Sequence, residues 1–321
     1  MPSWFAPIPD PNASDSGAEG LAYDAERDLF YVSGGFSTDI YVLDRAGQIV
    51  ETIDILAQYP NANGLRVYSK GLELGPSSGL AGNDTIVTLG GNDSISGGAG
   101  NDNISSGAGD DVIRVSGTGE GLDSIDGGAG TDRIEAGAKG TKIGLTSVTD
   151  VEVISANGFA AVTIAGSTAA DFLDFSNTTL TGITAIKTLA GNDTVYGSAG
   201  ADFIVGGAGS DTLRGNAGTD RFDYNTTGES RVNARDKILD FTPGVDKLDL
   251  AGIDASTAVT GNQAFNYLGD SAFTHHAGEL RIDTSDLSKT IVSGDTNGDG
   301  VADFAIELVG NLQLSAGDFF L

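Results

Sequence analysis

Several features are missing from this sequence, and each absence excludes a class of protein. The 321 residues include no cysteine, so neither disulfides nor thiolate metal sites stabilise the chain. Methionine and tryptophan each occur once. No apolar run is long enough to cross a membrane. Basic residues are scarce: 17 Lys and Arg against 45 Asp and Glu give a net charge of −28, which disfavours nucleic acid and anionic membranes as partners. The opening MPSWFAPIPDPNASDSG lacks the basic and apolar segments of a secretory signal peptide.

Glycine, by contrast, is abundant at 48 residues, and much of it falls in a nine-residue repeat. Residues 79–135 read GLAGNDTIV, TLGGNDSIS, GGAGNDNIS, SGAGDDVIR, a looser twelve-residue copy VSGTGEGLDSID, and GGAGTDRIE. Residues 188–223 read TLAGNDTVY, GSAGADFIV, GGAGSDTLR and GNAGTDRFD. A flexible Gly/Asp linker or a series of Asx turns would not need an apolar residue two places after every Asp. The pattern therefore predicts a repeating fold.

Each copy divides into a six-residue glycine-rich loop and a three-residue strand. One such strand buries too little to be stable, but stacked copies share a continuous apolar core. Two copies make one turn, so copies i and i+2 lie on the same edge, about 4.8 Å apart. The predicted core residues are Ile86, Ile95, Ile104, Ile113, Ile125, Ile134, Val195, Ile204, Leu213 and Phe222.

This geometry brings the Asp side chains of copies i and i+2 together across a shared gap. Carboxylates and loop carbonyls form an all-oxygen site of the kind that Ca²⁺ prefers, and we expect several ions. The expected ligands are Asp84, Asp93, Asp102, Asp111, Asp123, Asp132, Asp193, Asp202, Asp211 and Asp220. The expected pairs are Asp84 with Asp102, Asp93 with Asp111, Asp193 with Asp211, and Asp202 with Asp220. Weaker pairs, Asp102 with Asp123 and Asp111 with Asp132, are expected where the three-residue insertion disturbs the register.

The repeats resemble those of the RTX (repeats-in-toxin) family of secreted bacterial proteins. The resemblance implies a parallel β-roll that binds calcium. Between the two blocks, residues 136–187 lose the Asp loops, but VEVI, VTI, FLDF and ITAI recur about every ten residues. We expect the same solenoid to continue there with wider, calcium-free rungs, and we expect Asp171 and Asp174 to be surface acids.

The first 78 residues have a different pattern. Residues 1–17 are expected to be a loose arm, followed by short strands at 20–23, 29–33, 40–43 and 49–53. This antiparallel segment resembles one blade of secreted six-bladed propellers, including the phytase-like esterases, and 64–78 resembles the start of another. A closed propeller needs at least about four blades, so the segment is either a cap on the roll or a remnant. Residues 75–79 match the G-x-S-x-G pattern of hydrolases, but without the strand–turn–helix context that the motif requires.

Residues 224–321 resemble the C-terminal module of serralysin-type secreted proteases, through ARDKILDFTPGVDKLDLAGID, AGELRID and SGDTNGDGVADFAIELVGN. The chain has no H-E-x-x-H, so the resemblance does not extend to zinc protease chemistry. It implies a β-sandwich-like cap and an uncleaved C-terminal export signal, for which Asp318 and the apolar residues after it are the candidates.

Two further motifs lie in this module. Asp295, Asn297 and Asp299 have the D-x-N-x-D-G spacing of an EF-hand loop, but Ile306 stands where the bidentate Glu belongs. The loop is therefore either a further calcium site or a tight β-turn. His275 and His276 could ligate a metal, although exposed loop residues are expected. With no cysteine, and with both histidines far from the repeats, zinc and copper are disfavoured there.

The sequence predicts an all-β protein in five parts: an N-terminal β segment (1–78), a first β-roll block (79–135), calcium-free rungs (136–187), a second block (188–223) and a C-terminal module (224–321). The predicted function is a secreted calcium-binding protein that leaves the cell through type I secretion machinery and folds on extracellular calcium. Alternatives are a surface adhesin or matrix protein, with a cell-surface or matrix partner, and the tail of a secreted phosphoesterase-like hydrolase. No complete catalytic constellation supports an enzyme.

Overall fold

The structure is a computed structural model that describes residues 18–24, 29–34, 39–43, 49–54, 80–88 and 90–321. Its first part is a four-stranded antiparallel sheet in the order β1-β2-β3-β4. The strands are β1 (Ala18–Asp24), β2 (Leu29–Gly34), β3 (Asp39–Leu43) and β4 (Ile49–Asp54). These strands confirm the four that the sequence predicts. The predicted arm (1–17), the second blade start (64–78) and the G-x-S-x-G motif (75–79) lie outside the described residues.

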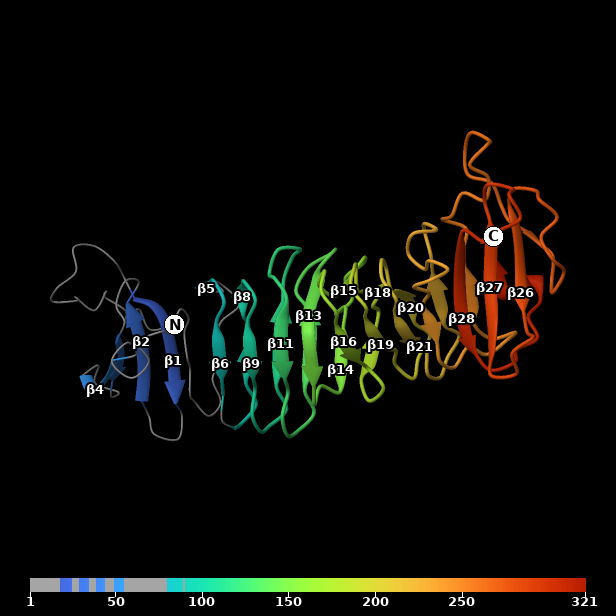
Figure 1. Cartoon of the computed structure of the whole chain (residues 1–321). Helices are drawn as coiled ribbons and strands as arrows, with labels where there is room; N and C mark the ends of the chain where they lie inside the picture. The colour runs from blue at the N-terminus through green and yellow to red at the C-terminus, as the bar shows by residue number, and fades with distance from the viewer. Residues whose placement is uncertain (1–17, 25–28, 35–38, 44–48, 55–79, 89) are drawn as a thin grey trace.

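The first block of repeats forms a parallel solenoid, whose rungs stack along one axis (Figure 1). Its two faces are built by alternate copies. One face contains β6 (Thr85–Val87), β9 (Asn103–Ser105) and β11 (Asp123–Asp126). The other contains β7 (Ser94–Ile95), β10 (Val112–Val115) and β12 (Arg133–Ala136), while β5 (Leu80–Ala81) pairs with β8 (Gly98–Ala99) in the loops. Copies i and i+2 are therefore neighbours, as predicted.

The apolar positions align from rung to rung, so one side chain lies on the next. Ile86 pairs in register with Ile104, and Ile104 with Ile125. Beside the three-residue insertion the register is kept between β11 and β9, but it shifts between Asp123 and Ser124 where β11 pairs with β13. The extra residues are held within the loop, where the Glu120 carboxylate accepts a hydrogen bond from the Ser116 N–H at 2.6 Å.

The middle of the solenoid contains a break in one face. Its strands are β13 (Lys142–Thr149), β14 (Val153–Ser155), β15 (Thr163–Ala165), β16 (Phe172–Asp174), β17 (Thr179–Thr181) and β18 (Ala185–Lys187). The rung that follows β15 has two strands. β17 pairs in parallel with β14, which lies earlier in the chain, and β16 pairs in parallel with β19, which lies later. One sheet thus ends at β17 and another begins at β16, and the fully buried Phe175 ring packs in the core beside this break.

The second block and the C-terminal module share their sheets. The repeats supply β19 (Thr194–Tyr196), β20 (Phe203–Val205), β21 (Thr212–Arg214) and β22 (Arg221–Asp223). One face continues into β23 (Lys237–Ile238) and then β28 (Phe304–Val309), β27 (Lys289–Asp295), β26 (Glu279–Asp283) and β25 (Asn266–Tyr267). The other continues into β24 (Lys247–Asp249) and β29 (Phe319–Phe320), which follows the short 3₁₀ helix η1 (Ala316–Asp318).

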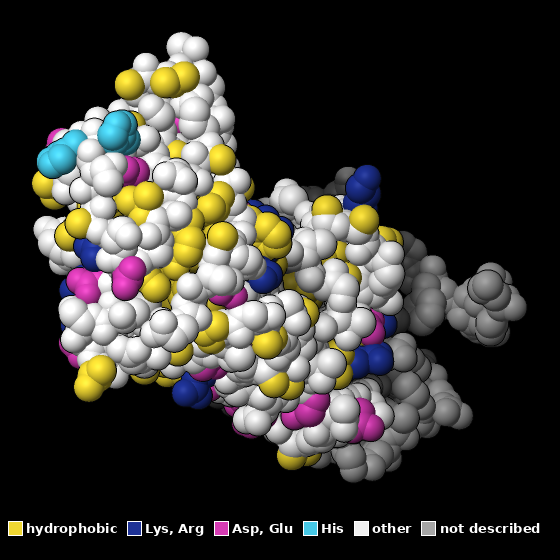
Figure 2. Space-filling view, turned by 90° about the vertical axis from the view of Figure 1, so that its right-hand side faces the viewer, with side chains coloured by type: hydrophobic (Ala, Val, Ile, Leu, Met, Phe, Trp, Pro, Cys, Tyr) yellow, Lys and Arg dark blue, Asp and Glu magenta, His cyan; other side chains and the backbone are white. Residues whose placement is uncertain are grey.

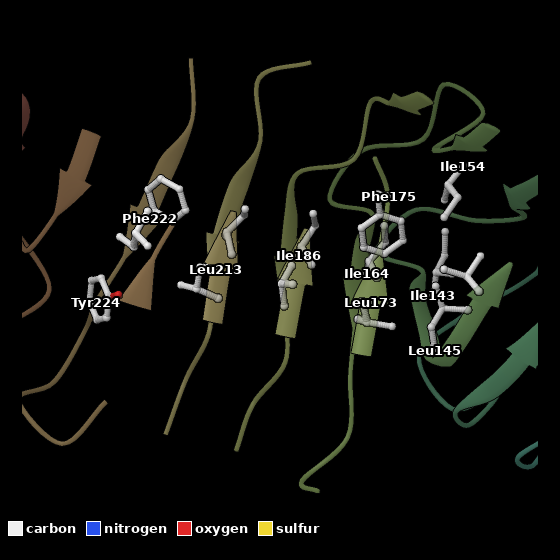
Figure 3. Close-up of a cluster of buried hydrophobic side chains, with 14 of the residues drawn as sticks. Ile143, Leu145, Ile154, Ile164, Leu173, Phe175, Ile186, Leu213, Phe222 and Tyr224 are labelled. Carbon is white, nitrogen blue, oxygen red and sulfur yellow. The ribbon is translucent and has the colours of Figure 1, made fainter. Parts of the chain in front are cut away.

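A single column of apolar side chains runs through the solenoid between the two faces (Figure 3). All ten predicted core residues are at most 3 % exposed. Burying one Ile or Leu side chain contributes about 1.5–3 kcal/mol, so the core gains its stability one rung at a time. Among the described residues, no helix is long and apolar enough to span a membrane.

Candidate calcium sites

The acidic loops stack as regularly as the core. On each edge of the roll, a carboxylate oxygen Oδ1 accepts a hydrogen bond from the backbone N–H of the Asp one rung earlier. The N–H of Asp84 donates to Asp102 at 2.8 Å, and that of Asp193 donates to Asp211 at 2.8 Å. The other predicted pairs have the same bond: Asp93 with Asp111 at 2.7 Å, Asp102 with Asp123 at 2.9 Å, Asp111 with Asp132 at 2.8 Å and Asp202 with Asp220 at 3.0 Å.

These bonds define acidic columns, which are the rows of same-edge Asp residues in each block. All ten predicted Asp residues lie in them, and each is at most 7 % exposed. The two pairs that span the insertion have this hydrogen bond at 2.9 and 2.8 Å, and the expectation that they bind calcium more weakly stays a prediction. Close stacking depends on glycine: a Cβ at Gly109, where φ is +133°, would lie 2.3 Å from the Gly91 carbonyl oxygen.

The second oxygen of most of these carboxylates is buried and unsatisfied. Among the described residues, Oδ2 has no hydrogen-bond partner at Asp102, Asp111, Asp132, Asp193, Asp211 and Asp220. Burying a carboxylate oxygen without a partner costs free energy, and native proteins rarely leave one so. A row of such oxygens is therefore a set of positions at which a cation would fit.

The pKa values of these carboxylates are raised, so the ionised form is disfavoured in the folded state. Burial, with a smaller contribution from neighbouring carboxylates, raises the pKa of Asp211 from 3.8 to about 7 and that of Asp132 to about 6. Asp123 and Asp220 are raised to about 7 by the same two causes. A cation between the rungs would reverse this effect, because an opposite charge favours the ionised carboxylate.

Comparisons with known proteins fit this geometry. Residues 78–113, 118–138 and 187–223 match the family described as "RTX calcium-binding nonapeptide repeat (4 copies)". These blocks are RTX repeats. RTX nonapeptide repeats bind Ca²⁺, and the acidic columns offer the hard carboxylate oxygens that this ion prefers.

One curated relative is the metallopeptidase AprA of Pseudomonas marginalis, which is 38 % identical over 95 residues. The match covers 29 % of this chain and 18 % of the relative, so the two share less than a fifth of the relative's length. Two solved structures are also similar, both subunits of the Azotobacter vinelandii mannuronan C5-epimerase AlgE6. AlgE6R2 is 28 % identical over 49 % of this chain and 91 % of its own, with a TM-score of 0.37. AlgE6R3 is 23 % identical over 54 % of this chain and 80 % of its own, with a TM-score of 0.30.

Sequence reasoning missed the residues that extend the acidic columns beyond the repeats. Asp236 accepts the Asp211 N–H at 2.8 Å, and Asp246 accepts the Asp220 N–H at 3.0 Å. Burial raises the pKa of Asp236 to about 8, although the hydroxyl of the buried Tyr224 beside it acts in the opposite direction. In the first block, Glu152 accepts the Asp132 N–H at 2.6 Å. These residues are 20 to 26 positions from their partners, whereas the regular spacing is 18, so the repeat pattern does not reveal them.

Two further residues lie differently from expectation. Asp171, expected at the surface, is 7 % exposed and begins a column, because its N–H donates to Asp193 at 2.8 Å. Asp174 is half-buried at the end of β16 and accepts the Ser176 N–H. Within the described part of the chain, no three His, Asp or Glu side chains converge on one point.

The loop at Asp295 joins two antiparallel strands, β27 and β28, rather than two helices. Asp295 is fully buried, and its two oxygens accept hydrogen bonds from the N–H groups of Asn297, Gly298 and Gly300. Asn297 and Asp299 each accept an N–H two residues further on. This bonding is that of a tight turn, and calcium binding here stays a prediction.

Both histidines are exposed, and they lie at the outer surface of the C-terminal module (Figure 2). The His275 ring is hydrogen-bonded to the Asp299 carbonyl at 2.8 Å, and the His276 ring to the Thr274 hydroxyl at 2.9 Å.

Proposed function

We propose that this protein is exported unfolded through type I secretion machinery and folds outside the cell when calcium fills its acidic columns. The observation that carries the proposal is the row of buried, unpartnered carboxylate oxygens. With no cation bound, the folded state keeps these carboxylates together in the loop stack, and burial raises their pKa values to about 7, which makes the ionised form unfavourable there.

Calcium changes this balance because it binds the folded stack and has no comparable site in the extended chain. Its binding free energy therefore becomes folding free energy. Glycine loops add to the dependence, because ordering glycine costs more backbone entropy than ordering other residues. In a cytosol with little calcium the repeats would stay unfolded, which suits passage through an export channel, and millimolar calcium outside would fold them.

The C-terminal module supports coupled folding of the repeats and the cap. Its strands β23 and β24 pair directly with the last repeat strands, β21 and β22. Asp236 and Asp246 extend the columns into the module, so a calcium ion between Asp211 and Asp236 would join the two parts. We propose both residues, and the nearby half-buried Glu229, as further calcium ligands.

The direct test is a calcium titration of the full chain followed by far-UV circular dichroism. We expect β signal to increase with calcium and to fall again when EGTA is added. Identical spectra with calcium and with excess EGTA would refute calcium-driven folding.

Export is tested separately by producing the full chain in cells that carry a type I exporter and measuring the protein in the medium. We expect export to fail when Asp318 and Phe319 are both replaced by Ala. Equal export of both chains would remove the proposed role of these residues and leave calcium-driven folding untouched.

A further inference from the structure

One repeat in the second block satisfies its own carboxylate. In the copy GSAGADFIV, the Ser198 N–H donates to Asp202 Oδ2 at 2.7 Å, and the Ser198 hydroxyl lies 3.0 Å from Oδ2 and 3.2 Å from Oδ1. The hydroxyl also accepts the Gly200 N–H at 3.0 Å. Asp202 is therefore unlike the Asp residues of the neighbouring copies, whose Oδ2 atoms have no partner among the described residues.

The same arrangement occurs at the start of the other column. The Ser167 N–H donates to Asp171 Oδ2 at 2.6 Å, and its hydroxyl donates to Oδ1 at 2.8 Å. In both cases the serine lies four residues before the Asp. Thr242 donates its N–H to Asp246 Oδ2 at 2.7 Å in the same way, beyond the repeats.

Backbone conformation separates the two kinds of loop independently of the hydrogen bonds. Where the Asp is unsatisfied, the residue four positions earlier has a left-handed backbone: Gly98 (φ +91°), Gly107 (+87°), Gly128 (+82°), Leu189 (+70°), Gly207 (+86°) and Asn216 (+65°). Ser167 and Ser198 are not among the described residues with positive φ. A serine at this position thus turns its own N–H towards the carboxylate, whereas the left-handed loops leave that oxygen open.

The two serines share a position along the roll. Each carboxylate points towards the preceding rung, since its Oδ1 accepts that rung's Asp N–H. Asp171 and Asp202 are the first acids of their columns, and the donors to both carboxylates come from their own loops. Each would otherwise be a buried charge at the open end of a column.

We infer that Ser167 and Ser198 cap the two calcium columns of the second block, so that the first carboxylate of each is held without calcium. The hydroxyl and N–H donors occupy the place that a cation takes deeper in the column. This inference rests on the proposed calcium-driven folding, and it assigns the two serines as positioning residues that set where calcium dependence begins.

The test is amide hydrogen exchange of the full chain, measured by mass spectrometry in excess calcium and in EGTA. For the wild type we expect the loop peptide 198–205 to exchange at the same rate in both conditions, and the peptide 207–214 to exchange faster in EGTA. In Ser198→Gly, we expect 198–205 to exchange at least about tenfold faster in EGTA, with little change in calcium. Ser198→Thr keeps the hydroxyl and should restore the protection.

Ser285→Gly is the matched control, because Ser285 also donates its N–H to an Asp in an exposed turn, outside the columns. It should leave 198–205 protected in both conditions, which separates the loss of the cap from the general effect of glycine. Calcium-dependent exchange of 198–205 in the wild type, or an unchanged rate in Ser198→Gly, would overturn the inference. Equal exchange of 207–214 in both conditions would instead refute calcium-driven folding itself.

Discussion

Asp211→Asn should change stability in opposite directions with and without calcium. Asp211 lies inside a column: its Oδ1 accepts the Asp193 N–H, its own N–H donates to Asp236, and its Oδ2 is buried and unpartnered among the described residues. Asn keeps the shape and the Oδ1 acceptor, so only the charge and one ligand oxygen are lost.

The magnitude without calcium follows from the pKa. A rise from 3.8 to about 7 is equivalent to about 4 kcal/mol of unfavourable free energy once the group is ionised. Solvent that reaches the loops screens part of this, so a gain of about 2 kcal/mol is the realistic expectation for Asp211→Asn in EGTA. In calcium the same substitution removes a charged ligand and should cost roughly 3 kcal/mol, the size of effect seen when one partner of a buried ion pair is removed.

The assay is the osmolyte concentration needed to fold the full chain in EGTA, and the urea midpoint in millimolar calcium, both at about pH 8, where the carboxylate is ionised. The osmolyte midpoint should fall because the variant is more stable in EGTA. The urea midpoint should also fall, because the variant is less stable in calcium. Asp270→Asn is the control, because it removes one exposed charge outside the columns and should move neither midpoint. Destabilisation of Asp211→Asn in EGTA as well would refute the argument, since the carboxylate would then stabilise the empty fold.

Three other predictions follow from the same columns. Without calcium, Asp123, Asp211 and Asp220 stay protonated in the folded state up to about pH 7 but ionise near pH 4 when unfolded. Stability in EGTA should therefore fall as pH rises from about 4 to 7, which osmolyte midpoints across that range would measure. A stability that increases with pH would contradict this prediction. Gly109→Ala should cost about 1–3 kcal/mol of stability, and so raise the calcium concentration needed for folding, because its Cβ would meet the Gly91 carbonyl oxygen. Gly117→Ala is the control, because Gly117 also has a positive φ (+98°) but open space around its Cβ. An equal effect of the two substitutions would reduce the explanation to backbone strain. Asp236→Asn should uncouple the C-terminal module, seen as faster amide exchange of β28 in calcium, and unchanged exchange there would exclude an ion at the junction.

The sequence predicts the periodic part of the molecule well because one physical rule acts there repeatedly. A two-copy turn fixes which residues are neighbours, so the aligned isoleucines and the pairs such as Asp84 with Asp102 follow from counting. The prediction fails where the period changes. Asp236 follows Asp211 by 25 positions and could be recognised as a column member only after β23 was known to pair with β21.

The insertion and the break between β17 and β16 show the same limit from two sides. Three extra residues in a loop left β11 in register with β9, because Glu120 closes the loop locally, whereas the pairing of β11 with β13 shifts at Asp123 and Ser124. In the middle rungs, the approximate ten-residue spacing of apolar residues locates β14, β15 and β18. It cannot show that one rung carries two strands, one paired with the preceding rung and the other with the following rung. Those pairings are tertiary contacts between rungs, which the local spacing does not contain.

The arrangement of calcium-dependent and calcium-free rungs gives the fold a direction of assembly. The middle rungs bury Ile143, Ile154 and Ile164 completely, and their core needs no ion to balance its charge. Both acidic blocks adjoin these rungs, since β12 pairs with β14 and β18 with β20, and the second block begins with carboxylates that serines already satisfy. We expect rungs to be added outwards from this centre, because each new rung gains a preformed neighbour on which its apolar strand can pack. The C-terminal module pairs with the final rungs of the second block through β23 and β24, so we expect it to dock after those rungs have formed.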